Sequence, residues 1–270
     1  MLCLNNLGHT YDCKPLWRGI SACLPLGSRV LLCGANGSGK STLLHILAGL
    51  FTPSAGSFRL GPDVIDSKSP AISPQADFEP WRSILLGHNT FLYPSLTVWE
   101  NLNFWVGLEE AIYQQSGTNA QGGTGQNRQA KIAETLNLLG LAALRDEKVA
   151  TLSKGMAQRL TLGRLYLTRA RLWLLDEPES ALDQDALLKL MHLVLAQKHC
   201  VVIWASHSLP ANYIANTQQL FTHCLCLNAK HSDETCETEL RELSGLADSK
   251  ANNGTSCEAD STINNGAKTC

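Results

Sequence analysis

Short runs of hydrophobic residues, separated by Gly, Pro and polar residues, divide the chain into alternating strands and helices. Continuous apolar runs too short for a helix predict buried strands, and apolar residues three to four positions apart predict helices. This alternation implies an α/β fold with a mostly parallel central sheet. The predicted strands lie within residues 1–33, 171–176 and 200–205, and the predicted helices span residues 41–50, 152–170 and 181–197.

Two internal segments and the C-terminal end depart from this alternation. Gly and Pro recur through residues 55–87, which predicts short strands and loops. Residues 97–144 have a helical pattern that is interrupted at residues 114–128, where Gly, Gln and Asn predict a flexible insertion. From about residue 229 the chain becomes polar, and residues 246–270 are predicted to be disordered.

The composition supports a globular domain without a membrane span of its own. Hydrophobic residues make up 44% of the 270 residues, enough for a sizeable core. The formal net charge of −2 argues against general nucleic-acid binding, so no nucleic-acid partner is expected. No apolar run reaches the length of a transmembrane helix, and the N-terminus lacks a secretory signal. We therefore expect a cytosolic protein that reaches a membrane only through a partner.

Ten cysteines are scattered along the chain, and none forms a Cys-x-x-Cys pair. In a cytosolic protein this pattern is typical of reduced thiols, several of them acting as small apolar core residues. The alternative is a metal site that contains His223, Cys224, Cys226 and His231. The alternation of residue types around Cys224 favours a late strand over this metal site.

Residues 34–41 read Gly-Ala-Asn-Gly-Ser-Gly-Lys-Ser and match the phosphate-binding P-loop pattern GxxxxGK[ST] at every fixed position, between a predicted strand and a predicted helix. Glycines let backbone N–H groups close around phosphates, and the helix N-terminus attracts their charge. Lys40 is expected to reach the β- and γ-phosphates of ATP, and Ser41 to hold Mg²⁺. The expected ATP-binding residues of this segment are Gly34, Asn36, Gly37, Ser38, Gly39, Lys40, Ser41 and Thr42.

The apolar run at residues 171–175 ends in Asp176 and Glu177. A carboxylate at the C-terminal end of a strand faces the ligand crevice of an open α/β sheet. Asp176 is therefore placed to hold Mg²⁺, directly or through water, and Glu177 to polarise an attacking water as a general base. Alone the motif is weak, because Asp-Glu-Pro is common where a loop begins, but it gains weight downstream of a P-loop.

Residues 151–159, Thr-Leu-Ser-Lys-Gly-Met-Ala-Gln-Arg, resemble the LSGGQ signature of ATP-binding cassette (ABC) proteins and precede the acidic strand, as in that family. The resemblance covers about residues 1–228. It implies a P-loop NTPase core of ABC type with an antiparallel β-subdomain and an inserted α-helical subdomain at about residues 97–160. Residues 229–270 are then a polar C-terminal tail, which we expect to be disordered.

The same resemblance implies a homodimer or another head-to-tail pair of ATPase domains. In such a pair, Ser153 and the backbone of Gly155 contact the γ-phosphate held by the P-loop of the other domain. Lys154 and Met156 depart from the family pattern, which affects the strength of this contact. The alternative is an ordinary helix that begins with Ser153 as its N-cap.

Four more residues match functional positions of ABC proteins. Asp183 closes a Ser-Ala-Leu-Asp sequence like the D-loop, which communicates between the two sites, although such a sequence is also a common helix start. His207 follows a predicted strand and resembles the switch histidine that contacts the γ-phosphate. Tyr11 stands where the family has an aromatic residue that stacks on adenine, the alternative being a buried structural Tyr. His88 stands at the usual position of a glutamine near Mg²⁺ and water, or only shapes its loop.

One P-loop, one signature and no heptad array favour the ATPase subunit of a transporter over a soluble mechanical ATPase that acts on ribosomes or DNA. Leu-Gly-His at residues 86–88, followed by Leu-Thr-Val-Trp-Glu-Asn-Leu at residues 96–102, resembles the haem-exporter ATPases of cytochrome c maturation. This implies integral membrane permease subunits as partners and a peripheral position at the cytoplasmic face of the inner membrane. Another small ABC exporter is the alternative.

Overall fold

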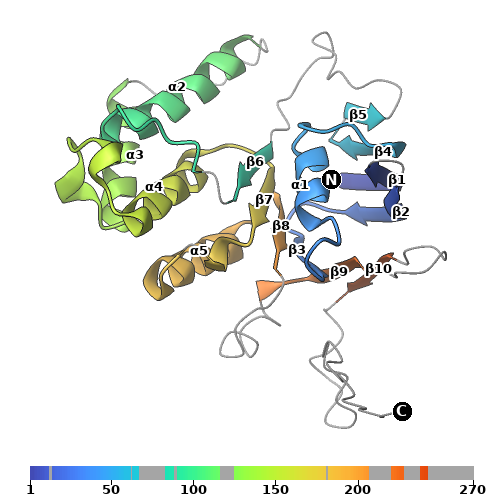
Figure 1. Cartoon of the computed structure of the whole chain (residues 1–270). Coiled ribbons are helices and arrows are strands. Elements are labelled where there is room, and N and C mark those ends of the chain that lie inside the picture. Colours follow the sequence, from blue (N-terminus) through green and yellow to red (C-terminus); the bar gives the residue numbers. More distant parts are fainter. Residues whose placement is uncertain are drawn as a thin grey trace, which may run out of the picture.

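The structure is a computed structural model. It describes residues 1–11, 14–61, 63–66, 83–87, 90–115, 125–180, 182–206, 220–227 and 238–242. These residues form two β-sheets and a separate group of helices (Figure 1). Within these ranges, no helix combines the length and the apolar character that a bilayer span requires.

The smaller sheet is antiparallel and comes from the first third of the chain. Its strand order is β2-β1-β4-β5, with β1 at Leu2–Tyr11, β2 at Lys14–Leu24, β4 at Ala55–Leu60 and β5 at Asp63–Asp66. Alternate residues of β1 and β2, including Leu2, Leu4 and Trp17, turn toward the core and are buried. This sheet matches the antiparallel β-subdomain expected from the sequence.

The larger sheet has the order β10-β9-β3-β8-β7-β6 and is parallel from β9 to β6. Strands β7 and β8 are buried on both faces, which explains their continuous apolar sequences. The carboxyl ends of β3, β8, β7 and β6 lie at one edge of the sheet. The strand bounds are β3 Arg29–Gly34, β6 Ser83–Leu86, β7 Leu172–Asp176, β8 Val201–Ala205, β9 His223–Leu227 and β10 Thr238–Glu242.

Helix α1 (Lys40–Leu47) lies between the two sheets (Figure 1). Its apolar residues Leu43, Leu44, Ile46 and Leu47 are at most 2% exposed and belong to one core with both sheets. The start of α1, where the P-loop stands, is therefore fixed between two packed layers.

The remaining helices lie on the other side of the large sheet. Helices α2 (Val98–Gln115), α3 (Gly125–Leu138) and α4 (Lys154–Leu167) form a helical lobe, and α5 (Gln184–Ala196) packs nearer the sheet (Figure 1). Short 3₁₀ turns at Ala142–Leu144, Val149–Thr151 and Pro178–Ser180 connect these elements. This lobe is the inserted α-helical subdomain that the ABC resemblance implies.

The start of α2 is set by hydrogen bonds within the Leu-Thr-Val-Trp-Glu-Asn-Leu sequence. The Thr97 N–H donates to the Glu100 carboxylate (2.8 Å), and the Glu100 N–H donates to the Thr97 hydroxyl (3.1 Å), which is a reciprocal capping box. The fully buried Asn101 amide accepts from the Tyr93 N–H and donates to the Tyr93 and Thr97 carbonyls. This motif therefore orders the loop at the entry of the helical lobe.

Three expectations need correction. The flexible insertion expected at residues 114–128 is wrong at both ends, because α2 continues to Gln115 and α3 begins at Gly125, while residues 116–124 lie outside the described residues. Strand β10 lies in the segment expected to be a disordered tail and pairs with β9, so that expectation is wrong for Thr238–Glu242. Cys3 and Cys23 face each other across β1 and β2 and form a disulfide. The expectation that the cysteines are reduced thiols is therefore wrong for these two.

Candidate active site

The loop between β3 and α1 approaches its neighbours so closely that two of its positions require glycine. Gly39 has a φ of 91°, in the left-handed region. A Cβ at Gly39 would lie 2.5 Å from Cδ2 of Leu16 and 2.6 Å from Nε1 of Trp17. At Gly34 a Cβ would lie 2.7 Å from the carbonyl oxygen of Leu227. The fixed glycines of the motif are thus explained by backbone shape and close packing.

Polar groups of this loop converge at the start of α1. Lys40 is only 6% exposed, and its Nζ donates to the carbonyls of Gly34 (2.8 Å) and Ala35 (3.2 Å). The hydroxyl of Ser38 is buried and finds no hydrogen-bond partner among the described residues. Among the described residues, no side chain caps the N-terminus of α1, and its first N–H groups can serve a ligand. An ammonium group, a hydroxyl and a helix N-terminus together fit a phosphate chain.

The other predicted residues of the loop are more exposed to solvent than Lys40 and Ser38. Asn36 and Gly37 are exposed at the tip, Ser41 is exposed in the first turn of α1, and Thr42 is half-buried beside it. The structure thus brings all eight predicted ATP-binding residues of this loop into one compact segment.

Asp176 lies at the carboxyl end of β7, in register with Ala205 at the end of β8. A Cβ added to Gly87, just past β6, would lie 3.4 Å from the Cβ of Asp176. Helix α1 packs against β7. The P-loop helix and the residue before His88 therefore both approach the strand that carries Asp176.

Glu177 has a left-handed backbone conformation, with a φ of 48°. Its N–H donates to the Ala205 carbonyl (2.9 Å), and its own carbonyl accepts from the N–H (3.0 Å) and hydroxyl (2.8 Å) of Ser180. A non-glycine residue in this region costs free energy and persists where surrounding contacts impose it, most often at functional sites. The turn thus fixes the backbone of Glu177 next to Asp176.

The donors near this edge fit Mg²⁺. Ser41 supplies a hydroxyl and Asp176 a carboxylate, which are the hard oxygen ligands that Mg²⁺ prefers together with substrate phosphates. Both belong to elements that pack on each other, α1 and β7. Ser41 and Asp176 are the residues of this chain that would hold the ion.

Glu179 has a role that the sequence analysis missed. Its carboxylate accepts a hydrogen bond from Nε1 of Trp204 (2.8 Å) and another from the hydroxyl of Ser206. Trp204 and Ser206 are 1% and 3% exposed. Glu179 therefore ties the turn after Glu177 to the end of β8, directly before His207. The only sequence signal was a second acid in Asp-Glu-Pro-Glu, which is too common to interpret alone.

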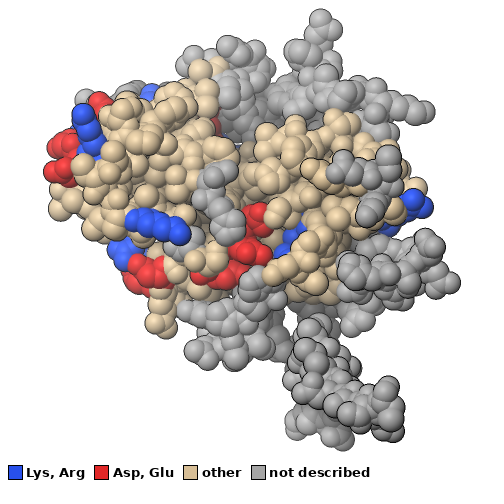
Figure 2. Space-filling model, viewed as in Figure 1, with Lys and Arg blue, Asp and Glu red and all other residues tan. Residues whose placement is uncertain are grey.

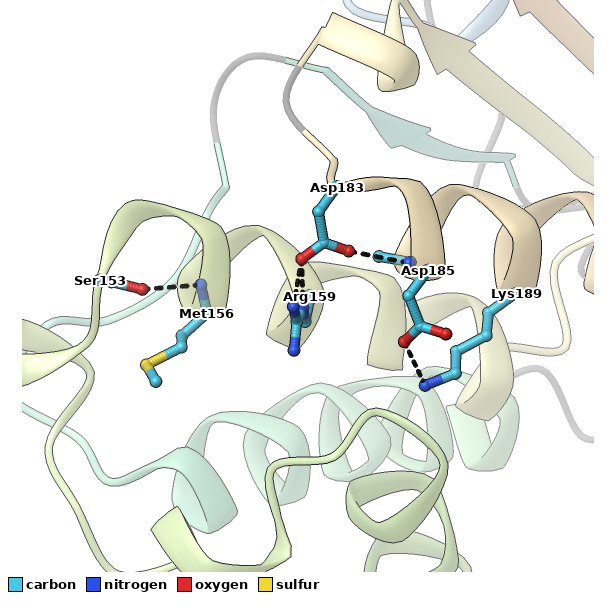
Figure 3. Close-up of polar contacts among 7 residues, drawn as sticks. Ser153, Met156, Arg159, Asp183, Asp185 and Lys189 are labelled. Carbon is cyan, nitrogen blue, oxygen red and sulfur yellow. Dashed lines mark hydrogen bonds and ion pairs between the residues drawn. The ribbon is translucent and has the colours of Figure 1, made fainter. Parts of the chain in front are cut away.

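The signature segment forms the start of α4, in the helical lobe. Ser153 is the N-cap, and its hydroxyl accepts from the Met156 N–H at 3.2 Å (Figure 3). A Cβ added at Gly155 would meet no atom within 4 Å, so its backbone faces open space. Ser153 is thus the helix cap that we considered as the alternative. The N-terminus of helix α4 lies in the helical lobe, away from the start of α1 where the P-loop of the same chain lies (Figure 1).

Asp183 joins the signature helix to the following helix. It is the N-cap of α5, where its carboxylate accepts from the Ala186 N–H (2.9 Å), and it also forms an ion pair with Arg159 of α4 (Figure 3). Hydrogen bonds from the Arg159 side chain and from the Ala186 backbone lower the pKa of Asp183. Asp183 is therefore held as a carboxylate between two helices.

Of the three remaining predicted site residues, the structure describes Tyr11 and leaves out His88 and His207. Tyr11 ends β1 and is 67% exposed, so its ring is not the buried structural Tyr of the alternative interpretation. His88 and His207 lie outside the described residues. Gly87 and Ser206, the residues before them, both lie at the carboxyl edge of the large sheet.

Charged side chains show no single basic face in the view of Figure 2. Lys and Arg are scattered there, and acidic side chains lie along the junction between the helical lobe and the sheets. The positive groups that the P-loop offers to phosphates are the buried Lys40 and the start of α1.

Comparison with known proteins agrees with this geometry. Residues 17–180 match the model of the family described as "ABC transporter". A protein of Sodalis glossinidius, named "Cytochrome c biogenesis ATP-binding export protein CcmA", is 34% identical over 78% of this chain and 91% of its own length. A protein of the same name from Pseudomonas syringae pv. tomato is 36% identical over 75% of this chain and 87% of its own.

Solved structures share the fold. One, described as a dimeric post-hydrolysis state of an ATP-binding cassette bound to ADP and Pi, has a TM-score of 0.69 at 20% identity and covers 91% of this chain and 100% of its own. At that identity the likeness concerns the fold alone. The family match and the relatives, which cover most of both chains, establish that this chain belongs to the ABC transporter family as one of its ATPase subunits.

Proposed function

We propose that this chain is the ATP-hydrolysing subunit of a membrane export complex for cytochrome c biogenesis, one that handles haem. The observation that carries the proposal is the identity of 30–36% to several proteins named for cytochrome c biogenesis, over most of both chains. The P-loop and the carboxyl edge of the large sheet that carries Asp176 and Glu177, called the acidic edge below, have the chemistry that such a subunit needs. Such a subunit couples ATP turnover to a membrane partner.

ATP binding is assigned to the P-loop and to Tyr11. The exposed ring of Tyr11 stacks on adenine, which needs only a free π-face. Lys40 exchanges its two carbonyl partners for the β- and γ-phosphates, because charge-assisted hydrogen bonds are stronger than those to carbonyls. The backbone between Gly34 and Thr42, together with the Ser38 hydroxyl, donates to the remaining phosphate oxygens.

Hydrolysis is assigned to the acidic edge. Ser41 and Asp176 would hold Mg²⁺, which would neutralise charge on the phosphate oxygens when bound. The oxygen of the attacking water bonds to the γ-phosphorus while Glu177 accepts a proton from that water. The bond between the γ-phosphorus and the leaving oxygen of ADP breaks in the same step. We assign His207 to the γ-phosphate and His88 to the water side of the site. The support is that Ser206 and Gly87, which precede them, lie at the edge that carries Asp176.

We propose that two copies pair head to tail. The start of α4, with Ser153, Gly155 and a first turn without acidic residues, offers N–H groups to an anion. It lies away from the P-loop of its own chain (Figure 1), so a γ-phosphate reaches it only from a second ATPase domain. Asp183 lies beside this helix through its ion pair with Arg159, which suits a role between the two sites.

The proposed partners are integral membrane permease subunits, with this chain peripheral at the cytoplasmic face of the inner membrane. The helical lobe, entered through the ordered loop before α2, is the part proposed to contact them. We propose that His88 senses the γ-phosphate side and shifts this lobe against the permease, since only a contact that differs between ATP and ADP states can move such an equilibrium.

Gene deletion with complementation tests this proposal. Loss of the gene is expected to abolish covalent haem attachment to c-type cytochromes, measured by haem staining after denaturing electrophoresis. The unaltered gene should restore attachment, whereas Lys40→Ala and Glu177→Gln should not. Normal haem attachment in the deletion strain would contradict the cytochrome c assignment and leave an ATPase of another small ABC exporter.

A further inference from the structure

Three cysteines that play no part in ATP chemistry meet where β3 pairs with β9. Cys33 stands directly before Gly34, and Cys226 is its partner in the parallel register. The Sγ of Cys224 lies 3.7 Å from that of Cys33 and 3.6 Å from that of Cys226. All three sulfur atoms lie within 4.8 Å of one another, and none belongs to a disulfide. We call Cys33, Cys224 and Cys226 the thiol cluster.

Strand geometry explains why the cluster forms. Leu225 and Leu227 are buried in the core shared with α1, so Cys224 and Cys226 point to the opposite face of the sheet. Leu32 of β3 is likewise buried in that core, which turns Cys33 to the same face as the two cysteines of β9. Two strands distant in sequence thereby present three thiols on one face, and each side chain is half-buried.

The spacing fits a bound metal ion. With Zn–S bonds of about 2.3 Å, the sulfur atoms of a tetrahedral site are separated by about 3.8 Å. The two sulfur–sulfur separations, 3.6 and 3.7 Å, are close to this edge length. Three sulfur ligands select soft cations such as Zn²⁺ and Cu⁺ over Mg²⁺ or Ca²⁺, which prefer oxygen.

The site differs from the one considered in the sequence. His223 alternates with Cys224 along β9 and therefore points to the other face, where its Nδ1 lies 2.7 Å from the Thr222 hydroxyl. The combination of His223 with Cys224 and Cys226 is thus wrong, and His231 lies outside the described residues. Cys33, far away in sequence, takes the place of the histidine because β3 and β9 pair.

We propose that the thiol cluster binds one soft, thiophilic metal cation, Zn²⁺ or Cu⁺, through three thiolates, with a fourth position left to water or an external ligand. Each thiol gives up its proton to solvent as its sulfur–metal bond forms. The ion joins β9 to the end of β3, immediately before the P-loop. The site is independent of the proposed role in cytochrome c biogenesis.

Zinc binding by the full-length chain tests the proposal. Cys13, Cys236, Cys257 and Cys270 lie outside the described residues and are replaced by Ser, so that thiols of unknown position do not contribute. Titration with Zn²⁺, followed by competition with a chromophoric chelator, should give one ion per chain. Co²⁺ in its place should give the intense near-ultraviolet absorption of cobalt–thiolate bonds.

Single replacements identify the ligands. Cys224→Ser and Cys33→Ser should each lower the zinc affinity by at least about 100-fold, since even second-shell changes cost 10–100-fold. Cys200→Ala is the matched control, because Cys200 is a buried thiol immediately before β8 and is not a member of the cluster. Bound Zn²⁺ should also protect the cluster thiols from alkylation.

Zinc bound with equal affinity by the control and by both cluster variants, or no stoichiometric binding of either Zn²⁺ or Cu⁺ by the unreplaced cluster, would overturn the proposal. Melting curves without metal show whether a variant is folded. If Cys224→Ser does not fold, Cys226→Ser provides the same test at the other edge of the cluster.

Discussion

Arg159 of the signature helix holds Asp183, the N-cap of α5, by an ion pair in which Nε of Arg159 donates to Oδ2 of Asp183 at 3.0 Å (Figure 3). The same carboxylate accepts the Ala186 N–H through its other oxygen. One carboxylate therefore connects the segment that resembles the signature to the segment that resembles the D-loop. Movement of α4 is expected to reach α5 through this pair.

Arg159→Gln should raise the pKa of Asp183 toward its ordinary value, because the Arg159 side chain is the largest cause of the lowered pKa. A carboxyl group with a lowered pKa in the folded state stabilises the fold above its unfolded pKa. That stabilisation is lost as the pH falls through the folded pKa. Since both side chains are about a third exposed or more, solvent screening limits the loss at neutral pH to about 0.2–1 kcal/mol. An NMR titration of the Asp183 carboxyl carbon measures the shift, with Arg145→Gln as the control. An unchanged pKa would contradict the pairing.

Gly39→Ala should destabilise the P-loop. The added Cβ would meet Leu16 and Trp17 at 2.5–2.6 Å, and the φ of 91° strains any L-residue. We expect the free energy of unfolding to fall by about 1–3 kcal/mol and ATP affinity to fall with it. Gly155→Ala is the control for folding, since its Cβ would meet no atom within 4 Å. Denaturant unfolding and ATP titration measure both effects, and equal stability of the two variants would count against the described loop geometry.

Glu179→Ala should lower the free energy of unfolding, because it removes the acceptor of two buried hydrogen-bond donors. The Trp204 indole and the Ser206 hydroxyl would lose their acceptor, at a cost of about 1–3 kcal/mol for each group left unsatisfied. Because Ser206 precedes His207, ATP hydrolysis should fall as well. Glu134→Ala, on the exposed surface of α3, is expected to change stability by less than about 0.5 kcal/mol. Urea unfolding of the two variants decides whether the Glu179 contacts contribute.

Truncation distinguishes β10 from the residues after it. A chain that ends at residue 245 keeps β10 and should melt like the full chain, because residues 246–270 have few apolar residues to offset the entropy of ordering. A chain that ends at Leu227 leaves β9 as an exposed edge next to the P-loop strand and should melt at a lower temperature. Equal melting temperatures of the two truncated chains would show that β10 adds nothing to the fold.

Much of the fold was predictable because its signals are local. The runs that form β7 and β8 are apolar on both faces, and GxxxxGK[ST] fixes a strand, a loop and a helix in order. Strand β10 was not predictable, because its sequence Thr-Glu-Leu-Arg-Glu lacks an apolar run and its order depends on pairing with β9. The start of α3 was missed because Gly125 and Gln126 look like loop residues until packing is known.

Within the site, residues that share a motif were predictable and residues that act across strands were not. Asp176 and Glu177 were found from an apolar run that ends in acids. The contacts of Glu179 with Trp204 and Ser206, and the approach of Cys33 to Cys224, depend on strand register, and sequence separation hides them. The Cys3–Cys23 disulfide depends on register in the same way.

The rate of ATP hydrolysis by Glu177→Gln, compared with the unaltered chain under saturating Mg²⁺-ATP, shows whether Glu177 is the general base of this ATPase. Glutamine keeps the size of the side chain and cannot accept the proton from water. We expect a rate lower by about 10²–10⁴-fold, the typical contribution of a positioned base, with ATP affinity retained. A steady-state rate equal to that of the unaltered chain would contradict the assignment of Glu177 and the hydrolytic site built around it.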